Sequence, residues 1–151
     1  MDLHQILVRT RTRSRLPIAD KAGVLATIAQ LIGTDVANLD TTALTAGLTA
    51  RERLGSTGLG DGIAIPHCRL KSAQTLTGAL ITLAEPIEFD ALDDEPVDIV
   101  FALIAPEDAA QAHLTTLATL AERFSQSDFR QRLRTASTDA ELFDAALMKL
   151  S

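Results

Sequence analysis

The segment Val97–Ile104 (VDIVFALI) constrains the fold most strongly, because it is nearly continuously apolar. Side chains alternate between the two faces of a β-strand, so a strand that is apolar throughout needs cover on both faces. This segment therefore predicts a central strand between two layers of helices. A second β-rich apolar run, Leu76–Leu83 (LTGALITL), predicts another buried strand, which a turn at Glu85-Pro86 should end.

The N-terminal segment Arg9–Ile18 alternates between arginine and other residues, which predicts an edge strand. The apolar stretch Leu3–Val8 before it predicts one helical turn. Alternate spacing would put four arginines on one side of the strand, namely Arg9, Arg11, Arg13 and Arg15. We interpret these arginines, and the later run Arg130, Arg132 and Arg134, as solvated faces.

Apolar residues recur with helical spacing between and after these strands. Asp20 is expected to cap a first helix that ends at Gly33, and Asp40 a second helix that ends at Gly55. Arg51 then falls in the last turns of the second helix. A third helix is expected to start at Pro106 and to bury one apolar stripe with His113 at its edge, formed by Leu114, Leu117, Ala121 and Phe124.

Strands that alternate with helices predict an α/β fold with helices on both faces of a small sheet. Shorter helices are predicted to start at Ser127 and at Ser137–Asp139, the last one reaching Leu150. The length of 151 residues predicts a single domain spanning residues 1–151.

The charge of the chain limits its partners. A net charge of −6 argues against nucleic acid, because binding to a phosphate backbone needs a basic face. No apolar run reaches about 18 residues and the N-terminus has no apolar signal region, so membrane insertion is not expected. The single cysteine excludes an internal disulfide and is typical of a reducing compartment. We therefore expect a cytoplasmic protein.

The stretch Arg51–Leu70 (RERLGSTGLGDGIAIPHCRL) carries the densest chemistry. It contains four of the eight glycines, at positions 55, 58, 60 and 62. A short apolar block, Ile63–Pro66, follows as a predicted strand and leads directly to His67. Glycine permits sharp turns and close backbone approach, so the loop can wrap an anion or place His67 at a cleft.

These residues supply the parts that phosphoryl transfer needs. A neutral imidazole at His67 can attack with one nitrogen while a hydrogen bond orients the other. The planar guanidinium of Arg51 suits phosphoryl oxygens, and the fold could bring His113 near as a second imidazole. Phosphoryl transfer depends mainly on positioning and charge neutralisation, which these groups provide.

Plainer interpretations of the same residues stay open. His67 could be a polar rim residue and the glycine loop a simple turn, which lacks the lysine of a Walker loop. His113 could be a helix boundary residue, and Arg51 could lie on an exposed face with Glu52 and Arg53.

Cys68 offers two further alternatives, zinc binding with the histidines or a nucleophile with His113 as its base. Adjacent ligands on a strand point to opposite sides, and no metal-binding spacing occurs, so we expect a semi-buried thiol and neither a metal nor a cofactor.

The sequence from Arg51 to His67 closely resembles the phosphohistidine signature of type-2 IIA domains of the phosphoenolpyruvate-dependent phosphotransferase system. The Gly-Ser-Thr-Gly run before Ile-Ala-Ile-Pro-His is most similar to the nitrogen-regulatory branch, with fructose and mannitol domains as relatives. His113 and the leucine-rich helix after it resemble the second element of the family. Cys68 departs from the family pattern, in which glycine is common after the histidine.

The resemblance implies a fold and a site. The fold would be a three-layer α/β/α sandwich with a small mixed β-sheet. His67 would be the phosphoacceptor, with His113 and Arg51 stabilising the phosphoryl oxygens in the same pocket. The loop residues next to the site would assist, namely Ser56, Thr57, Gly58 and Gly60.

The resemblance also implies partners. An HPr-like phosphocarrier protein would donate the phosphoryl group, and the output would be mainly regulatory, through target proteins that include potassium-handling ones. A first alternative is a sugar-specific IIA that passes the group to a IIB domain, and a second is a regulatory binding module that is not phosphorylated. Leu59, Ile63 and Ile65 are expected to form an apolar rim for such a partner, and a small interface suits a carrier that must leave after transfer.

Overall fold

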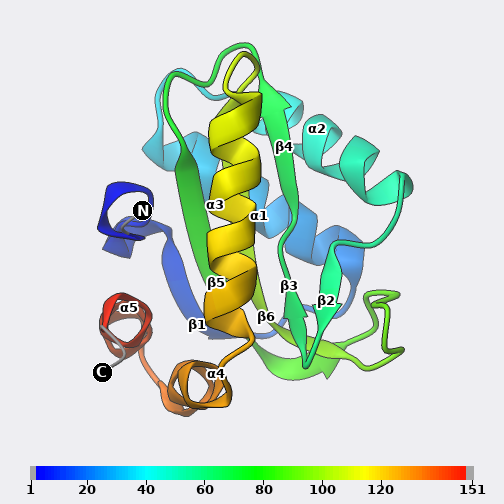
Figure 1. Ribbon diagram of the computed structural model, residues 1–151, viewed down its shortest axis with the longest axis vertical. Helices are drawn as coiled ribbons and strands as arrows, with labels where there is room; N and C mark the ends of the chain where they lie inside the picture. Colours follow the sequence, from blue (N-terminus) through cyan, green and yellow to red (C-terminus); the bar gives the residue numbers. More distant parts are fainter. Residues whose placement is uncertain (1–2, 149–151) are drawn as a thin grey trace.

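The computed structural model describes residues 3–148, and in them one six-stranded mixed sheet lies between helices (Figure 1). The strand order is β1-β5-β6-β3-β2, and β4 also pairs with β6. β1 is parallel to β5, and β3 and β4 are parallel to β6, whereas β5–β6 and β2–β3 are antiparallel. The strands are β1 (Thr12–Leu16), β2 (Gly58–Gly60), β3 (Ile63–Ala64), β4 (His67–Leu70), β5 (Thr77–Ile87) and β6 (Val97–Pro106).

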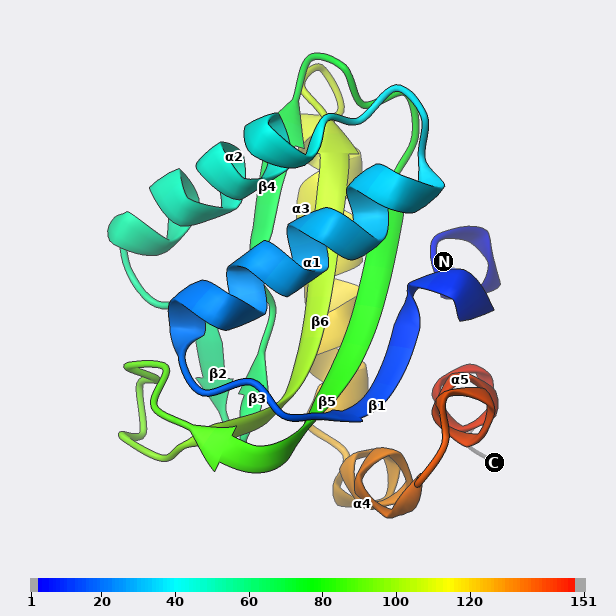
Figure 2. The ribbon, with the colours of Figure 1, turned by 180° about the vertical axis from the view of Figure 1, so that it is seen from behind.

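Helices cover both faces of the sheet. α1 and α2 lie on one face and α3 on the other, as the two opposite views show (Figures 1 and 2). The predicted three-layer α/β/α sandwich with a small mixed sheet is therefore confirmed. The helices are α1 (Lys21–Asp35), α2 (Thr41–Arg53), α3 (Ala110–Phe124), α4 (Ser127–Thr135) and α5 (Asp139–Leu147), with short 3-10 turns η1 (Leu3–Gln5) and η2 (Arg9–Arg11).

β6 is the central strand that its apolar sequence predicts. Ile99, Phe101 and Leu103 belong to the hydrophobic core under α3, whereas Val100 and Ala102 belong to the core under α1 and α2. All five side chains are at most 1% exposed. The continuous apolar run thus reflects burial on both faces of the sheet.

Two proline-based predictions are wrong. β5 continues through Pro86 to Ile87, because the pairing with β6 becomes irregular between Thr82 and Ile87 and so tolerates a residue without an N–H group. β6 likewise extends to Pro106, which pairs with Leu70 of β4, and α3 begins only at Ala110. In both places strand pairing overrides the local turn signal.

The caps of the first two helices are confirmed. The Asp20 carboxylate accepts from the Gly23 N–H at 2.7 Å, and the Asp40 carboxylate accepts from the Ala43 N–H at 3.0 Å. α1 nevertheless runs two residues past Gly33, at which a Cβ atom would collide with Thr41. That glycine therefore allows α1 and the start of α2 to approach closely.

The C-terminal helices start where they were predicted. α4 begins at Ser127, and Thr138 caps α5 by accepting from the Glu141 N–H at 3.1 Å. Leu150, the predicted end of the last helix, lies outside the described residues.

The N-terminal arginines do not form one solvated face. β1 is an edge strand, as predicted, but it starts only at Thr12, because Arg9–Arg11 form a 3-10 turn. Arg11 is 8% exposed and donates to the carbonyls of Gly78 at 2.8 Å and Ile6 at 3.0 Å. It also forms an ion pair with Asp35.

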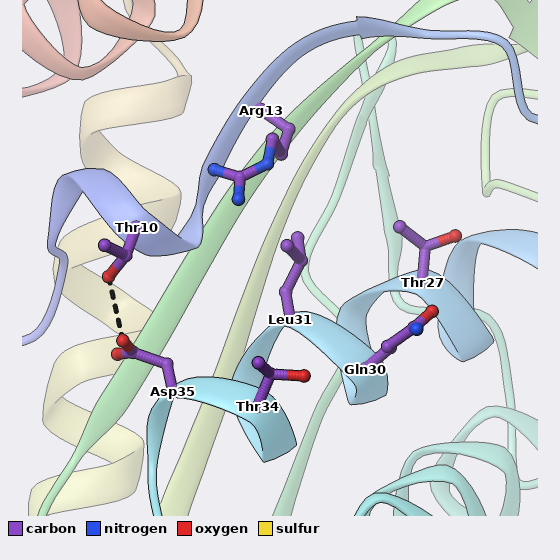
Figure 3. Close-up of a pocket in the computed structure, with 7 residues that line it drawn as sticks. All are labelled: Thr10, Arg13, Thr27, Gln30, Leu31, Thr34 and Asp35. Atoms are coloured by element: carbon purple, nitrogen blue, oxygen red, sulfur yellow. Dashed lines mark hydrogen bonds between the residues drawn. The ribbon is translucent and has the colours of Figure 1, made fainter.

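Asp35 lies at the end of a surface groove of about 440 Å³ between the N-terminal segment and α1 (Figure 3). Thr10 donates to Asp35 at 3.0 Å, so this carboxylate receives donors from two residues of the N-terminal segment. Arg13 projects over the same groove and donates to the Thr12 carbonyl at 3.0 Å. Arg11 and Asp35 thus attach the N-terminal segment to both α1 and β5.

We predict that Arg11→Ala lowers the free energy of unfolding by about 3 kcal/mol, because it leaves buried acceptors and a carboxylate without their charged partner. Arg13→Ala, two residues along, should change it by less than about 1 kcal/mol. Urea denaturation followed by circular dichroism measures both. Equal denaturation midpoints for the two variants would contradict this account of Arg11.

Candidate functional site

His67 is the first residue of β4, and its ring orientation is determined by a local hydrogen bond. Its Nδ1 lies 2.7 Å from the carbonyl oxygen of Ile65. A carbonyl can only accept, so Nδ1 carries the ring proton and Nε2 keeps its lone pair. The ring is half-buried. The sequence predicts that His67 directly follows a strand, whereas in the structure it begins one.

Arg51 lies against the free nitrogen of His67. Its Nε donates to His67 Nε2 at 3.3 Å, and its Nη1 donates to the Gly55 carbonyl at 2.8 Å. Arg51 belongs to the last turn of α2, as predicted, and reaches the ring from there. A guanidinium thus faces the nitrogen atom that is available to react.

His113 comes from α3 and meets the His67 ring in an edge-type contact. The two imidazole centroids are 5.2 Å apart, and their planes form an angle of 74°. His113 is 8% exposed, and its Nε2 is buried without a hydrogen-bond partner in residues 3–148. Buried polar atoms are normally paired, so this nitrogen indicates a place for a polar group of a ligand.

The three side chains face one cavity of about 620 Å³. Its wall combines two guanidinium groups and one carboxylate, that of Glu107, with imidazole and apolar side chains, and this excess of positive charge suits an anion. The lining residues are Ala50, Arg51, Leu54, His67, Cys68, Arg69, Glu107, Ala110, His113, Leu114 and Leu117.

Burial keeps both imidazoles neutral near pH 7. It lowers the pKa of His67, and the positive charge of Arg51 lowers it further, although the Ile65 hydrogen bond and Glu52 act in the opposite direction. The pKa of His113 falls to about 4, mainly through burial, with contributions from His67 and Arg69. Both rings are therefore uncharged, which is the state a nucleophile requires.

The loop residues Ser56, Thr57, Gly58 and Gly60 do not line this cavity. The Ser56 hydroxyl donates to the Phe89 carbonyl at 2.7 Å and accepts from the Gly58 N–H at 3.0 Å. The Thr57 hydroxyl donates to Glu52 at 2.7 Å. In this structure these side chains hold the loop in place, and their direct contact with a phosphoryl group stays a prediction.

The sequence analysis did not identify Glu52 as a site residue, because it considered Glu52 only as part of a possible exposed helix face with Arg51. It is 8% exposed and lies 3.1 Å from Lys21 Nζ. The sequence holds no decisive signal for this burial, because the exposed Glu122 likewise lies in the last turn of its helix, α3.

Cys68 does not match the alternatives of a nucleophile or a metal ligand. Its side chain is 7% exposed, and its thiol packs so closely on α2 that a Cβ at Gly47 would lie 2.9 Å from Sγ. Burial raises the thiol pKa to about 12, which disfavours the reactive thiolate. Within the described part of the chain, no group of three or more histidine, cysteine or acidic residues could hold a metal ion.

Two apolar surfaces differ from their predictions. α3 buries His113, Thr116, Leu120 and Phe124, whereas Leu114 of the predicted stripe is 63% exposed. Ile63 and Ile65 are at most 2% exposed, so of the predicted apolar rim only Leu59 reaches the surface. The exposed apolar residues next to the cavity are instead Leu54, which is 86% exposed, and Leu114.

Residues 6–147 match the family described as "Phosphoenolpyruvate-dependent sugar phosphotransferase system, EIIA 2". The chain therefore belongs to this family of phosphotransfer proteins, the type-2 IIA domains. This agrees with the resemblance of the segment from Arg51 to His67.

Within the family, the chain is similar to nitrogen regulatory proteins. It is 43% identical over 141 residues to one from Pseudomonas aeruginosa, covering 93% of this chain and 92% of that protein. It is 41% identical over 145 residues to one from Escherichia coli K12, covering 95% and 88%. The crystal structure of nitrogen regulatory protein IIA-Ntr from Neisseria meningitidis superposes with a TM-score of 0.87 at 36% identity, covering 95% of this chain and 98% of that one.

Across residues 3–148, no helix has the length and apolar character needed to cross a bilayer.

We predict that stability falls as the pH drops from about 6.5 toward 4. An unfolded histidine has a pKa of about 6.5, above the folded values of both His67 and His113. The unfolded chain therefore binds protons first, and the contribution of the neutral rings is complete only above that range. His113→Gln should flatten this part of the profile in urea denaturation measured at a series of pH values. Parallel profiles for wild type and variant would count against the account of His113.

Proposed function

We propose that the protein is a phosphocarrier that accepts a phosphoryl group on His67 from an HPr-like phosphocarrier protein. The observation that carries this proposal is the hydrogen bond of His67 Nδ1 to Ile65, which directs Nε2 into a cavity shared with Arg51 and His113. Family membership supports the same reaction class. A cytoplasmic location and a reaction without metal or cofactor belong to this proposal.

The transfer step follows from the ring geometry. The Nε2 lone pair attacks phosphorus, the bond between phosphorus and the donor atom breaks, and the donor keeps that electron pair. Nδ1 retains its proton, so the phosphorylated ring is positively charged, and the Ile65 carbonyl stabilises that charge. Arg51 must turn its guanidinium from Nε2 to the phosphoryl oxygens, for which its planar fork is suited.

His113 would complete the binding of the phosphoryl group. Its Nε2 lacks a hydrogen-bond partner within residues 3–148, and the residue lines the cavity together with His67. As an N–H donor it would hydrogen-bond a phosphoryl oxygen, where charge develops during transfer. Its low pKa keeps it neutral, so it would not repel the positively charged phosphorylated ring.

The proposal includes a mainly regulatory output, related to nitrogen or potassium. The similarity to nitrogen regulatory proteins supports the nitrogen-related part. The second candidate is a sugar-specific IIA that passes the group to a IIB domain, and the sugar-related description of the family favours it. Transfer from the phosphorylated protein to a fructose- or mannitol-type IIB domain would distinguish the second function from the first.

Leu54 and Leu114 would form the apolar contact surface for the donor. Both line the cavity of His67: Leu54 directly follows α2, and Leu114 belongs to α3. They are 86% and 63% exposed, which makes them available to a protein that must approach His67. A few well-packed side chains near the centre of an interface contribute most of its affinity.

We predict that the wild type gains one phosphoryl group when mixed with phosphoenolpyruvate, enzyme I and an HPr-like protein, as measured by intact mass. His67→Ala should gain none, whereas His4→Gln should behave like the wild type. Arg51→Ala and His113→Ala should each slow transfer by about 100-fold, because each removes a donor to the developing charge. An unchanged mass for the wild type would refute the proposal.

We predict that Leu54→Asp raises the concentration of carrier needed for half-maximal transfer by about 10-fold, with little change in the maximal rate. The matched control is Leu92→Asp, since Leu92 is 87% exposed and does not line the cavity. Initial rates over a range of HPr-like protein concentrations measure both variants. Indistinguishable curves for the two would show that Leu54 is not part of the contact.

A further inference from the structure

Glu52 places a carboxylate inside the protein one residue away from Arg51. Its Oε1 accepts from the Thr57 N–H at 3.0 Å and lies 3.1 Å from Lys21 Nζ, while its Oε2 accepts from the Thr57 hydroxyl at 2.7 Å. Burial of a carboxylate is unfavourable unless its oxygens are paired, and both oxygens are paired here.

The first connection leads from Glu52 to Arg51. The bonds to Thr57 close the short loop that follows α2, and the Gly55 N–H adds a bond to the Glu52 carbonyl at 3.2 Å. The loop therefore holds the Gly55 carbonyl where it accepts from Arg51 Nη1 at 2.8 Å. That contact leaves Arg51 Nε directed at His67 Nε2.

The second connection leads from Glu52 to the other nitrogen of His67. The carbonyl of Thr57 accepts from the Ile65 N–H at 3.0 Å. The carbonyl of Ile65 in turn lies 2.7 Å from His67 Nδ1. The residue that Glu52 holds is thus two hydrogen bonds away from the ring that would be phosphorylated.

A carboxylate is the side chain that suits this place. It accepts on two oxygens at once, whereas an amide accepts on only one. Lys21, the first residue of α1, supplies the positive charge and stacks 4.7 Å from the centroid of the Phe89 ring. The Phe89 carbonyl also accepts from the Ser56 hydroxyl, so residues around Glu52 hold the loop through Ser56 as well as through Thr57.

We infer that Glu52 is a positioning residue for phosphoryl transfer, which holds Arg51 against His67 Nε2 and fixes the backbone that orients Nδ1. The inference deepens the proposed function and rests on it for the reaction itself. It also assigns Thr57 a role through Glu52, without direct contact with the phosphoryl group.

The first test is a double-mutant cycle on the rate of phosphoryl transfer to His67. Glu52→Gln should slow transfer by about 10-fold, because a small misplacement of reacting groups has effects of this size. Combined with Arg51→Ala, the loss should be clearly smaller than the product of the two single losses. Glu122→Gln is the matched control, since Glu122 is an exposed acid in the last turn of α3. Single losses that multiply would overturn the inference.

The second test does not need phosphoryl transfer. Nitrogen NMR should show His67 with its proton on Nδ1 in the wild type and a mixture of the two neutral tautomers in Glu52→Gln. The Arg51 Nε–H proton should exchange faster with water in the variant. Thr57→Val, which removes only the hydroxyl donor, should give the same changes in weaker form. Identical spectra and exchange rates in all proteins would overturn the inference even if the wild type is phosphorylated.

A wild type that accepts no phosphoryl group, but whose His67 tautomer depends on Glu52, would refute the proposed function alone. Urea denaturation of each variant separates a loss of positioning from a loss of folding.

Discussion

The position of β4 determines how the site is assembled. This strand pairs only with β6 in the described chain, so one of its edges carries no further strand. α2 packs against β4 on one face of the sheet, whereas α3 lies on the other face and packs against β6 (Figure 1). Side chains alternate along a strand, so His67 meets His113 of α3 while Cys68 packs under α2. Arg51 reaches the His67 ring from the last turn of α2.

The fold can be predicted from the sequence wherever the local residue pattern and the pairing between strands favour the same structure. The run Val97–Ile104 predicts β6, because a strand that is buried on both faces has apolar residues at nearly every position. Aspartate caps predict the starts of two helices for a local reason, a side chain that accepts from a nearby N–H group. Pro86 and Pro106 mislead because pairing with a neighbouring strand, which no local pattern reveals, decides their conformation.

The candidate site divides in the same way. The resemblance to the family implies which residues meet, and the structure brings His67, Arg51 and His113 together in one cavity. Glu52 was missed because its burial depends on Lys21, which belongs to α1, and on the way the loop after α2 folds back to place Thr57 against it. Helical spacing also predicted burial of Leu114 rather than His113. The periodicity depends only on which residues are apolar, whereas His113 is buried because it packs against the imidazole of His67.

The contact between Arg51 and His67 has a consequence for selectivity. In this structure the Nε2 lone pair of His67 accepts a hydrogen bond from the Arg51 guanidinium, and an uncharged electrophile would have to break that bond without offering the guanidinium an anionic partner. An incoming phosphoryl group offers the same guanidinium two anionic oxygens, which form stronger hydrogen bonds than a neutral ring nitrogen. If His67 is the phosphoacceptor proposed above, Arg51 would therefore leave Nε2 for an anionic reactant and would keep it covered toward a neutral one.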